Sequence, residues 1–395
     1  MAGSFEGVDF YDVDSLLSDE ERMIRDTVRR WVDDRLMPII GAAYIERRFP
    51  REIIPELGEL GVLGANLPEE YGCAGLNNVA YGLIMQELER GDSGVRSFAS
   101  VQGALVMYPI HSFGSEEQKR AWLPRLAAGQ AVGCFGLTEP DYGSNPAGMI
   151  TTARERGGGW VLNGTKMWIT NGSMADVAVV WAQTGEQGDA KGIRGFVVPT
   201  DTPGFSARAQ KGKLSLLASD TSELHLHDMK LPREALLPGS GGLKSPLMCL
   251  TQARYGIAWG AVGAAMACFD EARRYAKERV MFDGPIGGKQ IQQVRLAEML
   301  TGITQAQLLN LQLGRLKDRG EMTPQQVSLA KRNNVDMALT IARIARDLHG
   351  ANGITDEYPV IRHMLNLESV KTYEGTHDIH TLVLGHAATG IAAYQ

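Results

Sequence analysis

A single carboxylate near the C-terminal end of the chain has neighbours that suit a general base. Glu374 lies between Tyr373 and Gly375, in a run that extends from Thr372 to His380. A glycine ends a helix and allows the side chain beside it to turn into a cavity. An aromatic neighbour removes water from a carboxylate and raises its pKa toward the range of about 6 to 7 that suits proton abstraction. An ordinary helix-end glutamate explains this run equally well when it is taken alone.

Two further segments could bind a planar polar group. The first extends from Phe135 to Asn145 and is rich in small and hydroxyl-bearing residues, including Thr138 and Ser144. Its freed backbone amides suit a flat ring or a phosphate. The second, Trp168 to Thr170, places an indole and a hydroxyl at the end of a predicted strand. A plain turn and a core tryptophan are the simpler explanations of these segments.

The elements that must position these segments change character twice along the chain. Residues 1–130 have helical periodicity, residues 131–240 have strand periodicity, and residues 241–395 are helical again. We find no internal repeat and no long linker. The pattern therefore predicts an α+β protein with an N-terminal helical domain, a middle β-domain and a C-terminal helical domain.

Local signals support these predicted elements. Capping boxes begin at Ser18, Ser115 and Thr323, where a hydroxyl precedes a Glu or Gln by three positions. Asn163-Gly164 lies between two short apolar runs and predicts a tight hairpin turn. The uncharged stretch from Gly256 to Phe269, rich in Gly and Ala, is too short to span a bilayer and predicts a buried helix.

Composition excludes several classes of partner. The chain has 395 residues, is 44% hydrophobic, and is therefore long enough to bury the cores of two or three domains. A net charge of −6 and a pI near 5.8 argue against nucleic acid or an anionic membrane as the main partner. The segment Met1 to Leu16 has four acidic residues and no Lys or Arg, which is unlike a secretory or mitochondrial presequence.

The sequence predicts no metal site. The four cysteines lack the Cys-x-x-Cys spacing of zinc and redox sites, so we expect free thiols in a reducing cytoplasm. His225 and His227 share one face of a predicted strand, but two imidazoles are too few to form a metal site. An exposed strand face explains this histidine pair better.

The three segments in this order resemble the acyl-CoA dehydrogenase family over essentially the whole chain. Glu87 to Ser97 and Tyr373 to His380 resemble the glutaryl-CoA dehydrogenases within that family. The resemblance implies an N-terminal helical domain of residues 1–130, a middle β-domain of residues 131–240 and a C-terminal four-helix bundle of residues 241–395. It also implies one FAD per subunit and a homotetramer.

The resemblance implies that Glu374 removes the α-proton of an acyl-CoA thioester while FAD takes the β-hydrogen as hydride. The amide of Glu374 and a ribityl hydroxyl of FAD would hold the thioester oxygen, as an oxyanion hole does. The expected FAD contacts, some of them from a neighbouring subunit, are Phe135, Leu137, Thr138, Gly143, Ser144, Trp168, Thr170, Arg279, Phe282, Gln290, Asp347, Leu348, Gly350, Ala351, Thr376 and Tyr394.

One of the expected acyl-CoA contacts, Arg96, indicates which kind of acyl group is bound. An acyl pocket is normally apolar, so the guanidinium of Arg96 indicates an anionic group that reaches it. Arginine binds a carboxylate through a two-point fork, and Glu89 would tune this interaction. Alternatively, Arg96 forms a surface or intrahelical pair with Glu89 or Asp92. The expected substrate contacts are Glu89, Arg96, Ser97, Ser144, Leu247, Arg254, Tyr373 and Gly375.

Three functions remain open at this level. The first is a decarboxylating glutaryl-CoA dehydrogenase that forms crotonyl-CoA, reprotonates the product through Glu374 and passes electrons to electron-transferring flavoprotein. The second is a dehydrogenase for another short acyl-CoA, or a glutaryl-CoA dehydrogenase that does not decarboxylate. The third is an acyl-CoA oxidase or a flavin-binding protein without dehydrogenase activity. Departures from the family pattern at Asn145, Met281, Asp283 and Ala351 bear on FAD binding.

Overall fold

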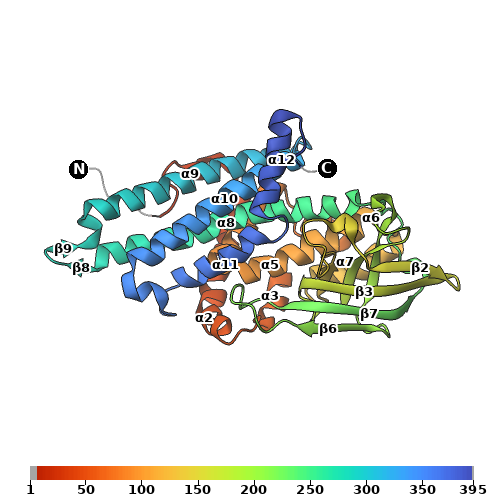
Figure 1. The fold of residues 1–395 in the computed structure, drawn as a ribbon. Coiled ribbons are helices and arrows are strands. Elements are labelled where there is room, and N and C mark those ends of the chain that lie inside the picture. The colour runs from red at the N-terminus through yellow and green to blue at the C-terminus, as the bar shows by residue number, and fades with distance from the viewer. Residues whose placement is uncertain (1–6, 394–395) are drawn as a thin grey trace.

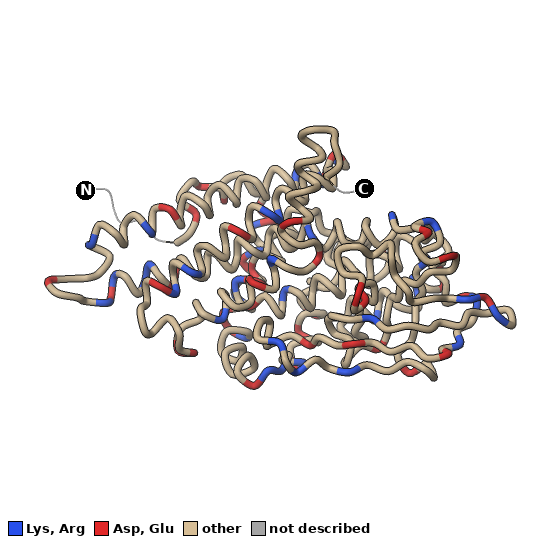
Figure 2. The backbone as a smooth tube through the Cα atoms, viewed as in Figure 1, with Lys and Arg blue, Asp and Glu red and all other residues tan. Residues whose placement is uncertain are grey.

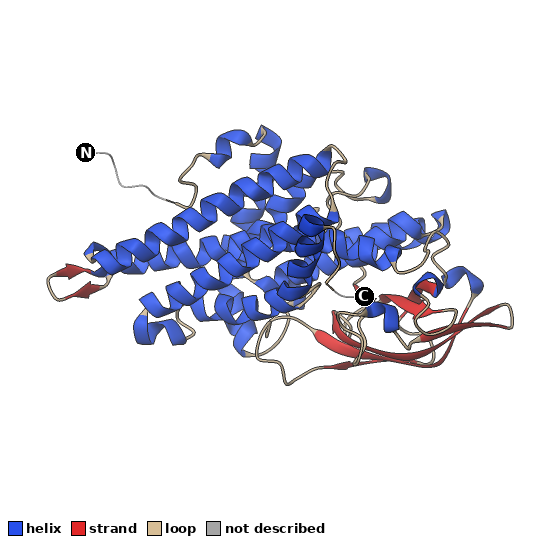
Figure 3. Ribbon diagram, turned by 45° about the horizontal axis from the view of Figure 1, so that its top comes forward, coloured by secondary structure: helices blue, strands red, loops and turns tan. Residues whose placement is uncertain are grey.

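The computed structural model describes residues 7–393 and shows an elongated helical body with a β-sheet packed at one end. The N-terminal and C-terminal parts of the chain pack together to form the helical body, and the middle part forms the sheet (Figures 1 and 3). The predicted fold class is confirmed. Because distant parts of the chain meet in the helical body, residues far apart in sequence can form one site.

The N-terminal region is helical, as its periodicity predicts. The capping box at Ser18 is present, since its hydroxyl accepts from the Glu21 amide at 3.2 Å and its amide donates to the Glu21 carboxylate at 2.8 Å. The boxes at Ser115 and Thr323 are also present. The helices are α1 (Asp19–Trp31), α2 (Met37–Ile45), α3 (Ile54–Glu59), α4 (Asn78–Gly91), α5 (Ser93–Ser100), α6 (Tyr108–Phe113) and α7 (Glu116–Ala127), with π-helical turns at Val32–Leu36 and Val101–Met107.

The middle region forms one mixed sheet. Its order is β1-β4-β2-β3-β7-β6, and β5 pairs with the other side of β4. The pair β1 and β4 is parallel, whereas β3 is antiparallel to both β2 and β7. The strands are β1 (Gly133–Gly136), β2 (Thr152–Arg156), β3 (Gly159–Thr170), β4 (Val177–Gln183), β5 (Ile193–Pro199), β6 (Phe205–Ala209) and β7 (Thr221–Leu231).

The hairpin turn predicted at Asn163-Gly164 is wrong. Strand β3 continues through both residues, and the turn between β2 and β3 lies at Gly157 and Gly158, which have φ angles of 61° and 79°. The side chain of Asn163 instead bridges to Asp228 on β7, donating at 3.1 Å and accepting at 2.8 Å. Gly164 lies so close to Thr151 that a Cβ there would be 2.3 Å from the Thr151 hydroxyl oxygen. This close approach explains the glycine without a turn.

The C-terminal region is a helical bundle around α8, which packs against α4, α9 and α10. The stretch Gly256 to Phe269 forms the middle of α8 and is almost entirely buried, as predicted. The elements of the C-terminal region are α8 (Lys244–Glu278), the small hairpin β8 (Val280–Met281) and β9 (Gly284–Pro285), α9 (Gln290–Asp318), α10 (Pro324–Leu348), α11 (Val360–Thr372) and α12 (His377–Thr389).

Charges of both signs are spread over all parts of the molecule (Figure 2). Within residues 7–393, no helix is both long and apolar enough to cross a membrane. The same described part of the chain contains no group of three or more His, Cys, Asp or Glu that could hold a metal ion. All four cysteines are buried free thiols.

Candidate active site

Glu374 lies in the short loop between α11 and α12, and the residue is partly buried. Its backbone has a φ of 51°, and the next residue, Gly375, has a φ of 93°. Burial raises the pKa of Glu374, while the positive charges of Arg96, Lys331 and Arg254 act in the opposite direction. Among the described residues, no group donates a hydrogen bond to its buried Oε2 atom. The carboxylate is therefore poorly solvated and free to accept a proton.

Arg96 on α5 and Glu89 on α4 form a completely buried ion pair. Both side chains are 0% exposed, and Arg96 Nε donates to Glu89 Oε2 at 2.6 Å. Arg96 Nη2 also donates to the Tyr373 hydroxyl. Within the described residues, Arg96 Nη1 and Glu89 Oε1 are buried and have no hydrogen-bond partner. This orphaned donor and acceptor mark a place where a polar ligand group can be bound.

Arg96 does pair with Glu89, as the alternative expected, but the pair is buried and joins two helices, so it is neither a surface pair nor an intrahelical one. Asp92, the other candidate partner, uses its carboxylate elsewhere. It accepts from the Gly94 amide at 2.7 Å and from the Asn366 side chain at 2.9 Å. Asp92 therefore caps α5 and links it to α11 by a hydrogen bond. The carboxylate that pairs with Arg96 is that of Glu89.

Several of the predicted substrate contacts meet around Glu374. Arg96 contacts the loop by donating a hydrogen bond to the Tyr373 hydroxyl. Arg254 Nε on α8 donates to the backbone carbonyl of Glu374 at 2.6 Å. Gly375 is enclosed, since a Cβ there would be 3.1 Å from the Arg254 guanidinium. Ser97 is buried one position after Arg96. By contrast, the two remaining predicted substrate contacts, Ser144 and Leu247, are exposed.

The segments predicted to hold a flavin lie next to each other. The backbone amide of Met167 donates to the Thr138 carbonyl at 2.9 Å, which joins the segment after β1 to the end of β3. A register shift in β3 between Lys166 and Ile169 places Trp168 at a φ of 62° with 58% of its surface exposed. Phe135 and Leu137 are buried beneath this region. The bulge therefore turns an indole outward beside a hydroxyl-bearing loop.

A second buried ion pair, between Glu139 and Lys166, holds these two segments together. Both side chains are 0% exposed and lie 2.9 Å apart, and Lys166 also donates to the Leu137 carbonyl at 3.0 Å. The Glu139 carboxylate accepts from the amides of Ile150 and Thr151 at 2.7 Å and 2.9 Å. Burial opposes ionisation of Glu139, but Lys166 and the hydrogen bonds lower its pKa overall. Sequence analysis did not assign a role to this pair.

The surroundings of Trp168 fit a flavin dinucleotide. A cavity of about 770 Å³ is lined by Met167, Trp168, residues 207–213, which include Arg208 and Lys211, and Glu223 opposite Arg208. An exposed indole face suits a flat ring, and cationic side chains suit a diphosphate. Thr138, Gly143, Ser144 and Thr170 were predicted to contact the same cofactor.

The other predicted FAD contacts lie in two further places. Arg279 and Phe282 belong to the β8-β9 hairpin, at the opposite end of the helical body from the sheet (Figure 1). Phe282 is 95% exposed with a φ of 59°, so this side chain is available to another molecule. A single chain does not bring these residues to its own Trp168. The remaining positions near this end are Gln290 at the start of α9, Asp347 and Leu348 at the end of α10, and Gly350 and Ala351 just after it.

The three further predicted FAD contacts are Thr376, Tyr394 and Asp347. Thr376 is the N-cap of α12, and its hydroxyl accepts from the Ile379 amide at 3.2 Å. Tyr394 lies outside the described residues. Asp347, predicted to contact FAD from a neighbouring subunit, forms an ion pair with Arg295 at 2.7 Å. The roles of all three toward FAD stay predictions.

Lys331 on α10 is the residue at this site that sequence analysis missed. Its side chain is buried, and its ammonium donates to the carbonyls of Tyr373 and Gly375. Burial lowers its pKa to about 7. The spacing of apolar residues could have indicated that Lys331 is buried, because it lies four positions from both Val327 and Val335 on the buried face of the helix.

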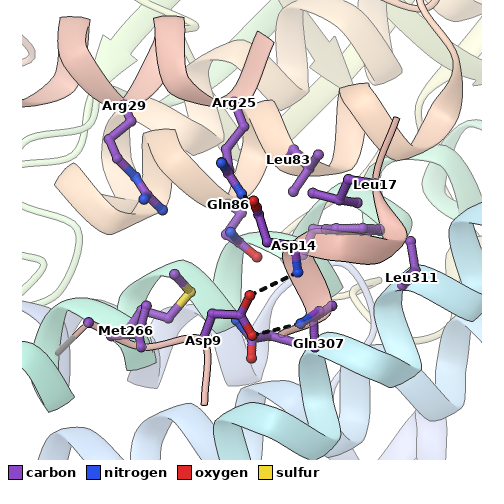
Figure 4. A pocket seen from close by; sticks show the side chains of 14 residues that line it. Asp9, Asp14, Leu17, Arg25, Arg29, Leu83, Gln86, Met266, Gln307 and Leu311 are labelled. Atoms are coloured by element: carbon purple, nitrogen blue, oxygen red, sulfur yellow. Dashed lines mark hydrogen bonds and ion pairs between the residues drawn. The ribbon is translucent and has the colours of Figure 1, made fainter. Parts of the chain in front are cut away.

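A separate cavity of about 320 Å³ lies under residues 7–17, between α1, α4, α8 and α9 (Figure 4). Asp9 accepts from the amides of Val13 and Asp14 at 2.8 Å and so orders the segment above the cavity. None of the residues predicted to bind substrate or cofactor lines this cavity. It is therefore distinct from the Glu374 site.

The chain resembles known proteins over nearly its whole length. The N-terminal, middle and C-terminal domain models of acyl-CoA dehydrogenases match residues 18–130, 134–229 and 240–389. A crystal structure of glutaryl-CoA dehydrogenase from Mycobacterium smegmatis is 57% identical, with a TM-score of 0.96, covering 99% of this chain and 100% of that one. A second from the same organism, in complex with FADH2, is 54% identical with a TM-score of 0.97 over 99% and 100% of the chains. The mitochondrial short-chain specific acyl-CoA dehydrogenase of Bos taurus is 37% identical over 94% of this chain and 90% of its own.

Proposed function

The chain belongs to the acyl-CoA dehydrogenase family and uses FAD, and we propose that it oxidises and decarboxylates glutaryl-CoA to crotonyl-CoA and carbon dioxide. The observation that carries the choice of substrate is Arg96. It is fully buried beside Glu89 and retains an Nη1 donor with no partner among the described residues. A buried cationic donor of this kind favours an acyl group that ends in a carboxylate.

Glu374 is proposed as the catalytic base. Its carboxylate would take the α-proton of the thioester, because desolvation raises its pKa and its buried Oε2 atom is free. The amide of Glu374 would donate to the thioester oxygen and stabilise the negative charge that develops there. Bound FAD supplies the acceptor for the β-hydrogen, which leaves with its electron pair. Thr138, Trp168 and Thr170 would hold the flavin on the sheet side.

Decarboxylation would follow within the same pocket. The bond between the γ-carbon and the terminal carboxylate breaks, carbon dioxide leaves, and the bond electrons pass into the conjugated thioester. Glu374, which then carries the proton it removed, would return a proton to the γ-carbon and become a carboxylate again. Arg96 would hold the terminal carboxylate until it leaves, and Glu89 would balance the charge of Arg96 afterwards.

Product analysis tests this proposal. The purified yellow protein is mixed with glutaryl-CoA and an artificial electron acceptor, and carbon dioxide and crotonyl-CoA are measured against acceptor reduced. With an acceptor that takes two electrons, equal amounts of all three are expected. Glutaconyl-CoA without carbon dioxide would indicate a non-decarboxylating dehydrogenase, and hydrogen peroxide formed without an acceptor would indicate an oxidase. Either result would overturn the proposal.

A second candidate is a dehydrogenase for another short acyl-CoA. It is favoured by the 37% identity to the short-chain specific enzyme of Bos taurus over 94% of this chain. The discriminating measurement is kcat/KM for glutaryl-CoA against butyryl-CoA. A higher value for butyryl-CoA would favour this second candidate.

The partner proteins and the compartment also remain proposals. The exposed apolar side chains of Val280, Met281 and Phe282 on the β8-β9 hairpin support assembly into a homotetramer whose subunits complete each other's FAD sites. Light scattering after size-exclusion chromatography would test the assembly. Electron-transferring flavoprotein is proposed as the physiological acceptor, and its reduction by the substrate-loaded enzyme can be followed directly. The cytoplasmic location stays a prediction from the sequence.

A further inference from the structure

Three consecutive carbonyl groups around the proposed catalytic base point at positive charges. Lys331 Nζ on α10 donates to the Gly375 carbonyl at 2.6 Å and also donates to the Tyr373 carbonyl. Between these two, the Glu374 carbonyl accepts from Arg254 Nε at 2.6 Å and lies 3.5 Å from Lys331 Nζ. An ammonium has three hydrogens to donate and no acceptor, so it suits a ring of carbonyl oxygens.

This loop has a backbone shape that its sequence does not favour. Glu374 has a φ of 51°, a left-handed conformation that is unfavourable for a residue with a Cβ, and Gly375 follows at 93°. Space for another arrangement is small, because a Cβ at Gly375 would be 2.8 Å from His380 Nε2. Such a conformation persists only where surrounding groups hold it. Lys331 is the residue that contacts both ends of the loop.

The direction of the carbonyls determines the direction of the amides. In a planar trans peptide, the N–H points opposite to the C=O of the same unit. The N–H of Glu374 belongs to the same peptide unit as the Tyr373 carbonyl, which accepts from Lys331. This N–H therefore points away from Lys331, and within the described residues it donates to no acceptor. The donor is free to bind a ligand oxygen.

Lys331 also leaves the carboxylate of Glu374 free. In the described part of the chain, no carboxylate forms a hydrogen bond or ion pair with the Lys331 ammonium, whose partners are backbone carbonyls. The ammonium lies 5.7 Å from the centre of the Tyr373 ring, a second favourable contact for a buried cation. Lys331 can thus fix the loop without a direct salt bridge that would occupy the base.

We propose that Lys331 is a positioning residue for the proposed reaction: by binding the carbonyls of Tyr373 and Gly375, it aims the amide of Glu374 at the thioester oxygen. The proposal rests on the function given above. Lys331 acts through the loop and does not touch the reacting atoms. Its effect should therefore be largest on the step in which negative charge develops on the thioester oxygen.

The test uses the FAD-loaded enzyme and acetoacetyl-CoA, whose enolate has its own absorbance and whose deprotonation does not need the flavin as an oxidant. In Lys331→Met, the apparent pKa of bound acetoacetyl-CoA should rise by about one unit or more, because the enolate loses an aimed donor. The rate of flavin reduction by glutaryl-CoA should fall by about thirtyfold, and the Kd for acetoacetyl-CoA at low pH should change by less than about threefold.

A matched control is available in another buried lysine. Lys317 lies over the Tyr255 ring at 4.2 Å, and its ammonium hydrogen-bonds to none of the loop carbonyls. Lys317→Met should leave the pKa of bound acetoacetyl-CoA unchanged. If Lys331→Met does not retain its yellow colour and cooperative melting, Lys331→Gln is measured in the same way, with the same upward shift expected.

The outcomes separate this inference from the proposed function. A wild-type pKa for bound acetoacetyl-CoA in a folded Lys331 variant would overturn the positioning role alone. An equal shift in Lys317→Met would overturn it as well, because the effect would then follow the loss of any buried charge. Wild-type protein that binds acetoacetyl-CoA without forming its enolate, and whose flavin no acyl-CoA reduces, would overturn the proposed function and the positioning role together.

Discussion

Glu89–Arg96 in the helical body and Glu139–Lys166 in the sheet region are both fully buried pairs of a carboxylate and a cation, but they differ in completeness. Each carboxylate oxygen of Glu139 has a donor, and Lys166 donates to both a carboxylate and a carbonyl. In the other pair, Arg96 Nη1 and Glu89 Oε1 have no partner among the described residues.

The difference teaches where this molecule can bind a ligand. A buried polar atom without a partner loses about 1 to 3 kcal/mol relative to a satisfied one, so such atoms are kept where a ligand satisfies them. We call Glu89, Arg96, Tyr373 and Glu374 the open cluster, and Glu139 with Lys166 the closed pair. The open cluster should act on substrate, whereas the closed pair should hold the loop after β1 against β3.

The largest effect is expected at the base of the open cluster. Glu374→Gln should keep the yellow FAD but slow flavin reduction by glutaryl-CoA about a thousandfold or more, because an amide cannot take the α-proton. Stopped-flow absorbance under anaerobic conditions measures the rate. Rapid bleaching in this variant would mean that another group is the base. Its melting temperature should not fall, since the change removes a buried carboxyl whose pKa is raised.

The next largest effect is expected on the free energy of unfolding when the closed pair is broken. Lys166→Met should lower the free energy of unfolding by about 3 kcal/mol, because it leaves the buried Glu139 carboxylate without its cation. Urea unfolding measures the change. The control is Lys371→Met, which removes an exposed ion pair with Asp336 and should cost less than about 1 kcal/mol. Similar losses in the two variants would contradict the assignment of Glu139–Lys166 as a structural pair.

The preference for glutaryl-CoA over butyryl-CoA should change when the open cluster is altered and stay the same when the closed pair is altered. Arg96→Gln should lower kcat/KM for glutaryl-CoA about thirtyfold more than for butyryl-CoA, because only the dicarboxylic substrate places a charge near Arg96. Lys166→Met should change the two values by the same factor. Equal losses on both substrates in Arg96→Gln would remove the role of Arg96 as a carboxylate anchor.

The smallest effect is the dependence on pH. Burial raises the pKa of Glu374 above its ordinary value of 4.5, so flavin reduction should slow while the falling pH is still above that value, because the protonated base cannot accept a proton. Glu139 has a lowered pKa, so its contribution to stability is present above its ordinary value of 4.5 and is lost only at lower pH. Activity should therefore fall with pH while the contribution of Glu139 to stability is still present. A rate that is constant down to pH 5 would contradict the raised pKa of Glu374.

Much of the fold was predictable from local patterns. The capping boxes at Ser18, Ser115 and Thr323 are present because each depends on residues only three positions apart. The buried middle of α8 was predictable because an uncharged run rich in small residues has little alternative but to pack closely. The hairpin at Asn163-Gly164 was predicted wrongly, since Asn163 is bound by Asp228 on a strand distant in sequence.

The open cluster was predictable in part. Glu374 and Arg96 were singled out by residue type, one beside a glycine and an aromatic ring, the other in a stretch that resembles a known subfamily. Their common location could not be derived from spacing, because α4, α5 and the α11-α12 loop meet only after the bundle is packed. Lys331 and the closed pair were missed because their partners are mostly backbone carbonyls and amides, which every residue carries.

By itself, the sequence determined the order of helical and strand regions, the helix starts and the identity of the titratable groups, since these depend on side-chain type and near neighbours. Tertiary structure alone decided which buried polar atoms find partners and which stay free, and it turned the carbonyls of Tyr373 and Gly375 toward Lys331. The physical reason is that hydrogen-bond satisfaction is a property of distance and direction between segments. Only the packed chain sets both.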